Sequence, residues 1–143
     1  MNERPVGIDE LNAVLAATPF LRPHGFVVTA CSSGECELRV PYDASQERPG
    51  GIISGMVIMG AADVALWLAI MTLRGLDERW VTSDMHTSFL RSGRAEDILC
   101  KAAVLRIGRR SAYGVAESRG VGSGELLAHH TLRYAKVATE NGE

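Results

Sequence analysis

The sequence predicts an α+β domain in which an antiparallel sheet of five to six strands wraps around one long central helix. Three observations predict this fold class: one long apolar segment at residues 52–71, four strand-like segments after it, and no second helix between those strands. The chain has 143 residues and a mass of 15.4 kDa. This length suits a single domain over residues 1–143 and leaves no room for a second.

The N-terminal part of the chain predicts a short helix and a hairpin. Apolar residues recur at helical spacing over about residues 8–16, and Pro19 then stops the run. Two strands are expected at residues 25–31 and 36–41, joined by a turn at residues 32–35. We expect the helix to act as a lid or a brace, and the hairpin to expose one face to water.

The central helix is predicted over about residues 54–74, with Ser54 as its N-cap and Gly75 at its end. Its run IISGMVIMGAADVALWLAIM carries one charge, Asp63, and could cross a bilayer by hydropathy and length alone. A charge near the middle of such a span costs about 2.5–3.5 kcal/mol, and no basic cluster flanks the run. We therefore expect a buried core helix rather than a membrane span.

Four further strands are predicted at residues 80–90, 97–107, 111–119 and 125–137, separated by turn signals. The helix, at 1.5 Å per residue, would be about 30 Å long, which is enough to traverse a sheet made of these strands. The sequence therefore predicts a sheet that wraps around a single helix.

Composition and charge exclude several classes of function. The 15 basic and 17 acidic residues give a net charge of -2, which argues against nucleic acid or an anionic membrane as a partner. The three cysteines, Cys31, Cys36 and Cys100, form no CxxC pair, and the N-terminus has no apolar secretory run. These features predict a reduced, cytoplasmic protein.

No motif in the sequence indicates a metal or nucleotide site. The histidines lack ligand spacing such as HExxH, so no metal is expected. A GxSxG elbow, a dinucleotide-binding glycine pattern and a phosphate-binding glycine loop are also missing from the sequence. The chemistry must therefore come from isolated polar residues.

Asp63 is the residue that a purely structural account explains least well. An ionised carboxylate in an apolar helix costs several kcal/mol unless it is paired or hydrated. Its helical neighbours at three and four residues cannot pair with it; they are Met59, Gly60, Leu66 and Trp67. A partner must come from another element or another chain. Two interpretations stay open: a structural carboxylate, or a catalytic or ligand-directed one.

The start of the helix is the second candidate site. Ser54, Gly55 and Met56 stand where unsatisfied backbone N–H groups could stabilise an oxyanion, although most helices begin with an ordinary capped turn. Gly55 and Asp63 are eight residues apart, about 12 Å along a straight helix, so one carbonyl cannot reach both in one chain. If both act on one carbonyl, two subunits must share the site, which predicts a homodimer.

Two further groups of polar residues have open interpretations. Thr82, Asp84, His86 and Ser88 share one face of their strand by simple alternation, which indicates either a solvated face or a Thr82 hydroxyl near Asp63. Arginines near the strand ends are either ordinary solvated side chains or contacts for a phosphate-bearing ligand; they are Arg91, Arg94, Arg106, Arg109 and Arg110.

Four runs of the sequence resemble a known family. They are PGGIISGMVIMGAADVALWLAI, VTSDMHTSFLRS, VLRIGRRSAYGVAES and GELLAHHTLRYAKV. Over about residues 20–137 the chain resembles the hotdog-fold acyl-CoA thioesterases of the phenylacetyl-CoA (PaaI-like) type. The resemblance implies a hotdog fold and hydrolysis of an acyl-CoA thioester to free acid and coenzyme A. It also implies a homodimer or a dimer of dimers (homotetramer), with no cofactor other than the coenzyme A of the substrate.

The resemblance also implies roles for individual residues. Asp63 stands at the catalytic carboxylate of the family, as general base or nucleophile, and Gly55 at the N–H that polarises the thioester carbonyl. Thr82 takes the place of a Ser or Thr near that carboxylate. Ser54 replaces the family's His and Arg48 its Asn, so two polar groups that orient substrate or water are changed.

The remaining residues that the resemblance implies would bind substrate. Met56, Met59 and Trp67 would shape the acyl pocket. Arg91, Arg109 and Arg110 lie in segments that match those that contact coenzyme A in relatives. Because the His and the Asn are replaced, a non-catalytic acyl-CoA-binding or regulatory domain is the alternative. A hydratase would need a His-containing motif that the sequence lacks.

Overall fold

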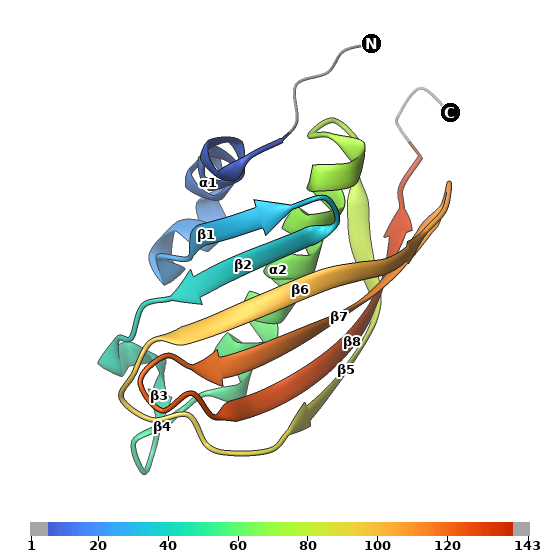
Figure 1. Ribbon diagram of the computed structural model, residues 1–143. Helices are drawn as coiled ribbons and strands as arrows, with labels where there is room; N and C mark the ends of the chain where they lie inside the picture. Colours follow the sequence, from blue (N-terminus) through green and yellow to red (C-terminus); the bar gives the residue numbers. More distant parts are fainter. Residues whose placement is uncertain (1–5, 139–143) are drawn as a thin grey trace.

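The computed structural model describes residues 6–138 and shows a six-stranded antiparallel sheet curled around one long helix, α2 (Figure 1). The strand order is β1-β2-β6-β7-β8-β5. The strands are β1 (Val27–Ser32), β2 (Glu35–Val40), β5 (Trp80–Phe89), β6 (Ile98–Ile107), β7 (Ser111–Gly120) and β8 (Leu126–Lys136). Each lies within two residues of the strand predicted for it, so the predicted hotdog architecture is confirmed.

Helix α2 (Gly55–Arg74) begins and ends where the sequence indicates. The Ser54 Oγ accepts a hydrogen bond from the Met56 N–H at 3.1 Å, which caps the first turn. At the other end Gly75 has a φ of +87°, and its N–H donates to the Met71 carbonyl at 2.9 Å. The helix thus has a side-chain cap at its start and a glycine at its end.

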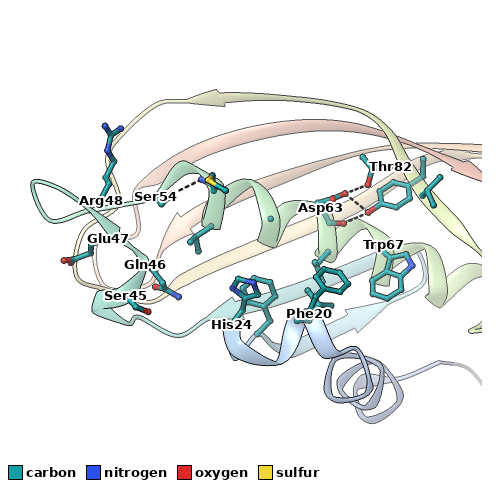
Figure 2. Close-up of a pocket in the computed structure, with 18 of the residues that line it drawn as sticks. Phe20, His24, Ser45, Gln46, Glu47, Arg48, Ser54, Asp63, Trp67 and Thr82 are labelled. Carbon is teal, nitrogen blue, oxygen red and sulfur yellow. Dashed lines mark hydrogen bonds between the residues drawn. The ribbon is translucent and has the colours of Figure 1, made fainter.

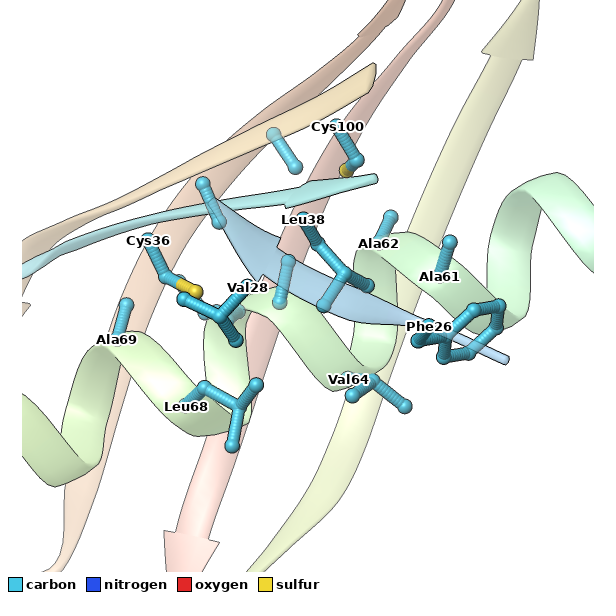
Figure 3. Close-up of a cluster of buried hydrophobic side chains, with 14 of the residues drawn as sticks. Phe26, Val28, Cys36, Leu38, Ala61, Ala62, Val64, Leu68, Ala69 and Cys100 are labelled. Atoms are coloured by element: carbon cyan, nitrogen blue, oxygen red, sulfur yellow. The ribbon is translucent and has the colours of Figure 1, made fainter. Parts of the chain in front are cut away.

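The core lies between α2 and the concave face of the sheet. Side chains of β1 and β2, among them Val28 and Leu38, face α2 (Figure 3). Gly114 on β7 is required by close packing, because a Cβ there would lie 2.5 Å from Leu66 Cδ1 and 2.6 Å from the Ala103 carbonyl oxygen. The small residue therefore lets the helix approach the middle of the sheet.

Helix α2 has the length and hydropathy of a membrane span, but it is the core helix of this fold. It has 20 residues and a mean hydropathy of 2.0 over its most apolar window, and 56% of that window is buried inside the protein. Ten of its residues are buried against the sheet or the N-terminal segment. The expectation of a buried helix is confirmed.

Helix α1 (Ile8–Ala17), two 3-10 helices and one small hairpin complete the fold. The 3-10 helix Pro19–His24 follows α1, and the 3-10 helix Ala44–Gln46 leads into the small hairpin of β3 (Glu47–Arg48) and β4 (Ile52–Ile53). The short elements were not predicted. They matter because the hairpin ends against the start of α2, where the Ser54 N–H donates to the Gln46 carbonyl at 2.8 Å.

The prediction that Thr82 shares a face with Asp84, His86 and Ser88 is wrong. Thr82 pairs with Tyr134 and Asp84 pairs with Arg133, so Ser83 is an extra residue in the ladder. Such a bulge reverses the side-chain alternation beyond it. Thr82 therefore faces α2, whereas the other three residues lie on the opposite face.

Candidate active site

A cavity of about 760 Å³ runs along the face of α2 that the sheet leaves uncovered. Its walls come from α2, the two 3-10 helices, β5 and β8, and Asp63 lies near one end of it (Figure 2). The opposite end, at the start of α2, holds Gln46, Arg48 and Ser54. The only carboxylate that α2 contributes to the fold therefore borders a cavity large enough for a small-molecule ligand.

Two hydroxyls hold the Asp63 carboxylate. The Thr82 Oγ1 on β5 donates to Asp63 Oδ1 at 2.6 Å. The Tyr134 hydroxyl on β8 lies 2.6 Å from the same Oδ1 and 2.6 Å from the main-chain oxygen of Asp63, so its proton is shared between them. The expectation that its partners come from other elements is met within one chain.

The two oxygens of Asp63 have different environments. Oδ1 accepts both side-chain hydrogen bonds, whereas Oδ2 accepts none from any residue between 6 and 138. Bonds through one oxygen fix the plane of a carboxylate and leave the other oxygen available to a water molecule or a substrate. The arrangement can therefore accept a proton or attack a carbonyl carbon at Oδ2.

Tyr134 was not predicted as a site residue. Its side chain is only 3% exposed, and burial, together with the neighbouring Asp63 carboxylate, raises the pKa of the phenol well above its ordinary value. The hydroxyl therefore stays protonated and serves as a permanent donor. Two features of the sequence could have identified Tyr134. The alternation along its strand predicts that it faces inward, and a buried tyrosine hydroxyl needs a hydrogen-bond partner.

Gly55 lies at a second cavity, of about 450 Å³, which it shares with Arg48, Phe89 and Arg91. Within the described part of the chain the Gly55 N–H has no hydrogen-bond acceptor, whereas the next N–H is capped by Ser54. Gly55 and Asp63 do not line the same cavity. This agrees with their separation of about 12 Å along the helix.

The other predicted residues are distributed along the molecule. Arg48 lines both cavities, and Met56 and Trp67 line the cavity of Asp63, whereas Met59 lines neither. Met56 is 83% exposed. The structure thus places two of the three residues predicted for the acyl pocket at this cavity.

The predicted arginines do not meet within one chain. Arg91 lies near the start of α2 and forms an ion pair with Glu125 at 3.9 Å. Arg109 and Arg110 border a separate hollow at the other end of α2, beside Arg74. A single chain therefore cannot bring Arg91 and the Arg109–Arg110 pair to one phosphate.

Aromatic side chains line the Asp63 end of the cavity, and several of them were not predicted. Phe20 and Trp67 lie close to Asp63 (Figure 2), and Trp80 and Val81 also line the cavity. The His24 ring stacks on Phe26 with centroids 5.1 Å apart. This end is apolar and suits a hydrophobic group of a ligand.

Within residues 6–138 no three His, Cys, Asp or Glu side chains gather as metal ligands.

Comparison with known proteins agrees with this architecture. The sequence model of the thioesterase superfamily matches residues 50–119, which span β4, α2, β5, β6 and all but the last residue of β7. A proposed esterase of Thermoplasma acidophilum is 30% identical over 126 residues, which is 88% of this chain and 94% of that protein. The chain belongs to the thioesterase superfamily, whose members with this architecture are hotdog-fold proteins.

Solved structures share the fold. A proposed thioesterase of Silicibacter sp. TM1040 superposes with a TM-score of 0.84 and 27% identity, covering 94% of this chain and 95% of that one. The PaaI protein of the Escherichia coli phenylacetic acid degradation operon superposes with a TM-score of 0.80, covering 89% and 90% of the two chains. At 16% identity, this similarity is evidence for the fold alone. Membership of the superfamily supports thioester hydrolysis as the general activity.

Proposed function

We propose that this protein hydrolyses an acyl-CoA thioester to a free acid and coenzyme A, at a site shared between two copies of the chain. One observation carries the proposal. The Asp63 carboxylate borders the large cavity and is oriented through Oδ1 alone by Thr82 and Tyr134. Superfamily membership supports the general reaction, and the apolar end of the cavity supports a hydrophobic acyl group.

Asp63 would act in one of two ways. As a general base, Oδ2 takes a proton from water while that water attacks the thioester carbonyl carbon; the carboxyl group then gives the proton to the departing thiolate. As a nucleophile, Oδ2 attacks the carbonyl carbon, the C–S bond breaks and the coenzyme A thiolate leaves; water then hydrolyses the resulting anhydride to the free acid and the Asp63 carboxylate. Thr82 would hold the carboxylate and the water in place.

The developing oxyanion would be stabilised by Gly55 of the partner subunit. The Gly55 N–H at the start of α2 has no acceptor within residues 6–138, and it lies at the positive end of the helix dipole. Since the Gly55 and Asp63 of one chain lie at different cavities, each site needs one residue from each copy. Two-fold symmetry then produces two equal sites in a dimer.

The uncovered edge of the sheet supports association with a second copy. Strand β5 pairs only with β8, and its other side has no strand partner in the described chain. A ten-residue edge with exposed apolar side chains is a template for pairing, and Phe89 and Leu90 at its end are 52% and 54% exposed. A dimer formed along β5 would cover them.

Coenzyme A as the thiol carrier is supported by the basic residues near the start of α2. Arg48 and Arg91 both line the second cavity, and guanidinium groups bind phosphate through paired hydrogen bonds. Ser54 and Arg48, which stand where the family has His and Asn, would contact the arm of coenzyme A that links the thioester to the phosphates.

The Asp63→Asn substitution tests the proposal. Asparagine has the shape of aspartate and can still accept hydrogen bonds through Oδ1, so the fold and the dimer should persist. It can neither accept a proton nor attack a carbonyl, so kcat for acyl-CoA hydrolysis should fall by about 10²–10⁴-fold. Thiol release from aryl-, short- and medium-chain acyl-CoAs measures kcat, and size-exclusion chromatography with light scattering measures the dimer. An unchanged kcat would remove Asp63 from the mechanism.

A non-catalytic acyl-CoA-binding domain is the second candidate. It is favoured by the role of the Ser54 hydroxyl, which caps the helix and stands in place of a histidine. Binding of the same acyl-CoA panel without any release of thiol by the unaltered protein would establish this candidate instead.

A further inference from the structure

Gly60 is a glycine that packing within the chain does not explain. It lies inside α2, where glycine is less favourable than alanine because it loses more conformational freedom on folding. A Cβ placed on Gly60 would meet no atom within 4 Å, in contrast to Gly114, where a Cβ would collide with Leu66. Gly60 also lines the large cavity. The missing side chain therefore leaves space in the cavity rather than room for the core.

Gly60 lies between the two ends of that cavity. Met56, Gly60, Asp63 and Trp67 follow one another at intervals of three or four residues and so form one stripe along α2. Figure 2 shows Ser54 and Arg48 beyond one end of this stripe, and Asp63 with Trp67 at the other. A ligand that extends from Asp63 to the start of the helix must cross the stripe at Gly60.

The two ends differ in chemistry. The end at Asp63 is aromatic, with Phe20, Trp67 and Trp80, whereas the end at the helix start presents polar groups of Gln46 and Arg48. An acyl group is apolar, while the arm on the thiol side of a coenzyme A thioester carries amides and phosphates. With the thioester carbonyl at Asp63, the acyl group fits the aromatic end and the thiol-side arm fits the polar end.

We propose that Gly60 is a specificity-determining position, whose missing side chain gives the thiol-side arm of the substrate its path along α2. This inference rests on the proposed hydrolysis of an acyl-CoA. A large side chain at residue 60 would block the arm next to Asp63 but would leave the aromatic end of the cavity unchanged. The site would then still accept a thioester whose thiol is small.

The test compares Gly60→Leu and Gly60→Ala on thioesters that differ only in the thiol. The substrates are phenylacetyl-CoA and hexanoyl-CoA, together with the S-ethyl thioesters of the same two acids. In Gly60→Leu we expect kcat/KM to fall about 10-fold or more for both CoA thioesters and to change less than about two-fold for both S-ethyl thioesters. Gly60→Ala should raise Tm by about 3 °C and lower kcat/KM for the CoA thioesters less than leucine does.

Two outcomes would overturn the assignment. Equal losses on CoA and S-ethyl thioesters would mean that residue 60 acts on Asp63 rather than on the arm. A loss that differs between the hexanoyl and phenylacetyl groups, and not between the two thiols, would mean that the acyl group lies over Gly60.

Binding separates a failure of this inference from a failure of the proposed function. If the unaltered protein cleaves none of the four thioesters, the proposed hydrolysis fails, and S-hexyl-CoA, a thioether that cannot be hydrolysed, becomes the probe. Both tryptophans of the chain, Trp67 and Trp80, line the cavity, so their fluorescence reports its binding. A Kd that is about 10-fold weaker in Gly60→Leu supports the path over residue 60, and an equal Kd overturns it.

Discussion

Asp63 illustrates how far single residues can be interpreted from a sequence. Its position in an apolar helix predicts that it needs partners from elsewhere, and Thr82 and Tyr134 supply them from two different strands. Thr82 was predicted beside it through the family resemblance. Tyr134 was not, because a tyrosine that alternates with buried Leu132 fits an apolar pattern, and its partner depends on how the helix packs on the sheet.

Replacing Tyr134 with phenylalanine should affect catalysis more than structure. The ring would keep its place in the core, but Asp63 Oδ1 would lose one of its two donors. A hydrogen bond to a charged group contributes about 1.5–3 kcal/mol, so we expect kcat to fall about 10-fold or more while KM changes little. Thiol release from acyl-CoA substrates measures both constants.

The control for this prediction is Thr82→Val, which removes the other donor to Oδ1 with little change in shape. Both variants should lower kcat and change KM little. A fall in Tm with an unchanged kcat in Tyr134→Phe would give Tyr134 a purely structural role.

At the scale of elements, strong periodicity predicted well and local irregularity did not. The long apolar run predicted α2, and strand-like segments between turn signals predicted all six strands of the sheet. The hairpin of β3 and β4 has two residues in each strand, which is too short to show a period. The bulge at Ser83 cannot be recognised from alternation, because the residues on both sides of it are polar. That bulge turns Thr82 toward Asp63.

His130 on β8 makes the sheet sensitive to acid. Its side chain is fully buried, with Nδ1 2.8 Å from Thr87 Oγ1 and Nε2 2.9 Å from Ser118 Oγ. Burial, followed by the nearby His129, lowers the pKa of His130 to about 4. The folded protein therefore binds fewer protons at this residue than the unfolded chain between about pH 4 and the ordinary histidine pKa of about 6.5.

The free energy of unfolding should therefore fall as the pH drops through this window. The contribution of His130 is fully present above about pH 6.5 and is lost toward pH 4, by about 3 kcal/mol in total. Urea unfolding between pH 4.5 and 7.5 measures it. His130→Gln should be less stable at pH 7 but should lose less stability in acid, whereas His86→Gln, at an exposed residue, should keep the slope of the unaltered protein. If the free energy of unfolding changed equally with pH in all three proteins, His130 would not be the source of the acid sensitivity.

At the scale of the whole molecule, the position of Gly55 decides how many chains a site needs. Gly55 is the first residue of α2, where proline is well tolerated, and Ser54 before it has the extended conformation that a following proline favours. Gly55→Pro therefore removes one N–H from an otherwise normal helix start. Gly55→Ala is the matched variant, since it keeps the N–H and adds the same Cβ, 3.0 Å from the Phe89 ring.

We expect kcat in Gly55→Pro to be at least about 10²-fold lower than in Gly55→Ala, because only the proline variant loses the oxyanion donor. Mixing Gly55→Pro with Asp63→Asn chains, after dissociation and reassociation, should restore activity. With random pairing half of the dimers are mixed and each has one intact site, so about one quarter of the normal activity should return. Activity that does not return on mixing would place both groups of each site in one chain.

The order of elements along the chain has a consequence for synthesis. Helix α2 ends at Arg74, but four of the six strands that shield it come later, and the last ends at Lys136, 62 residues further on. At about 5–20 residues per second the ribosome needs about 3–12 s to make them. During that interval a 20-residue helix with the hydropathy of a bilayer span emerges without its cover. The nascent chain therefore presents membrane-insertion factors and chaperones with a segment that the finished protein conceals.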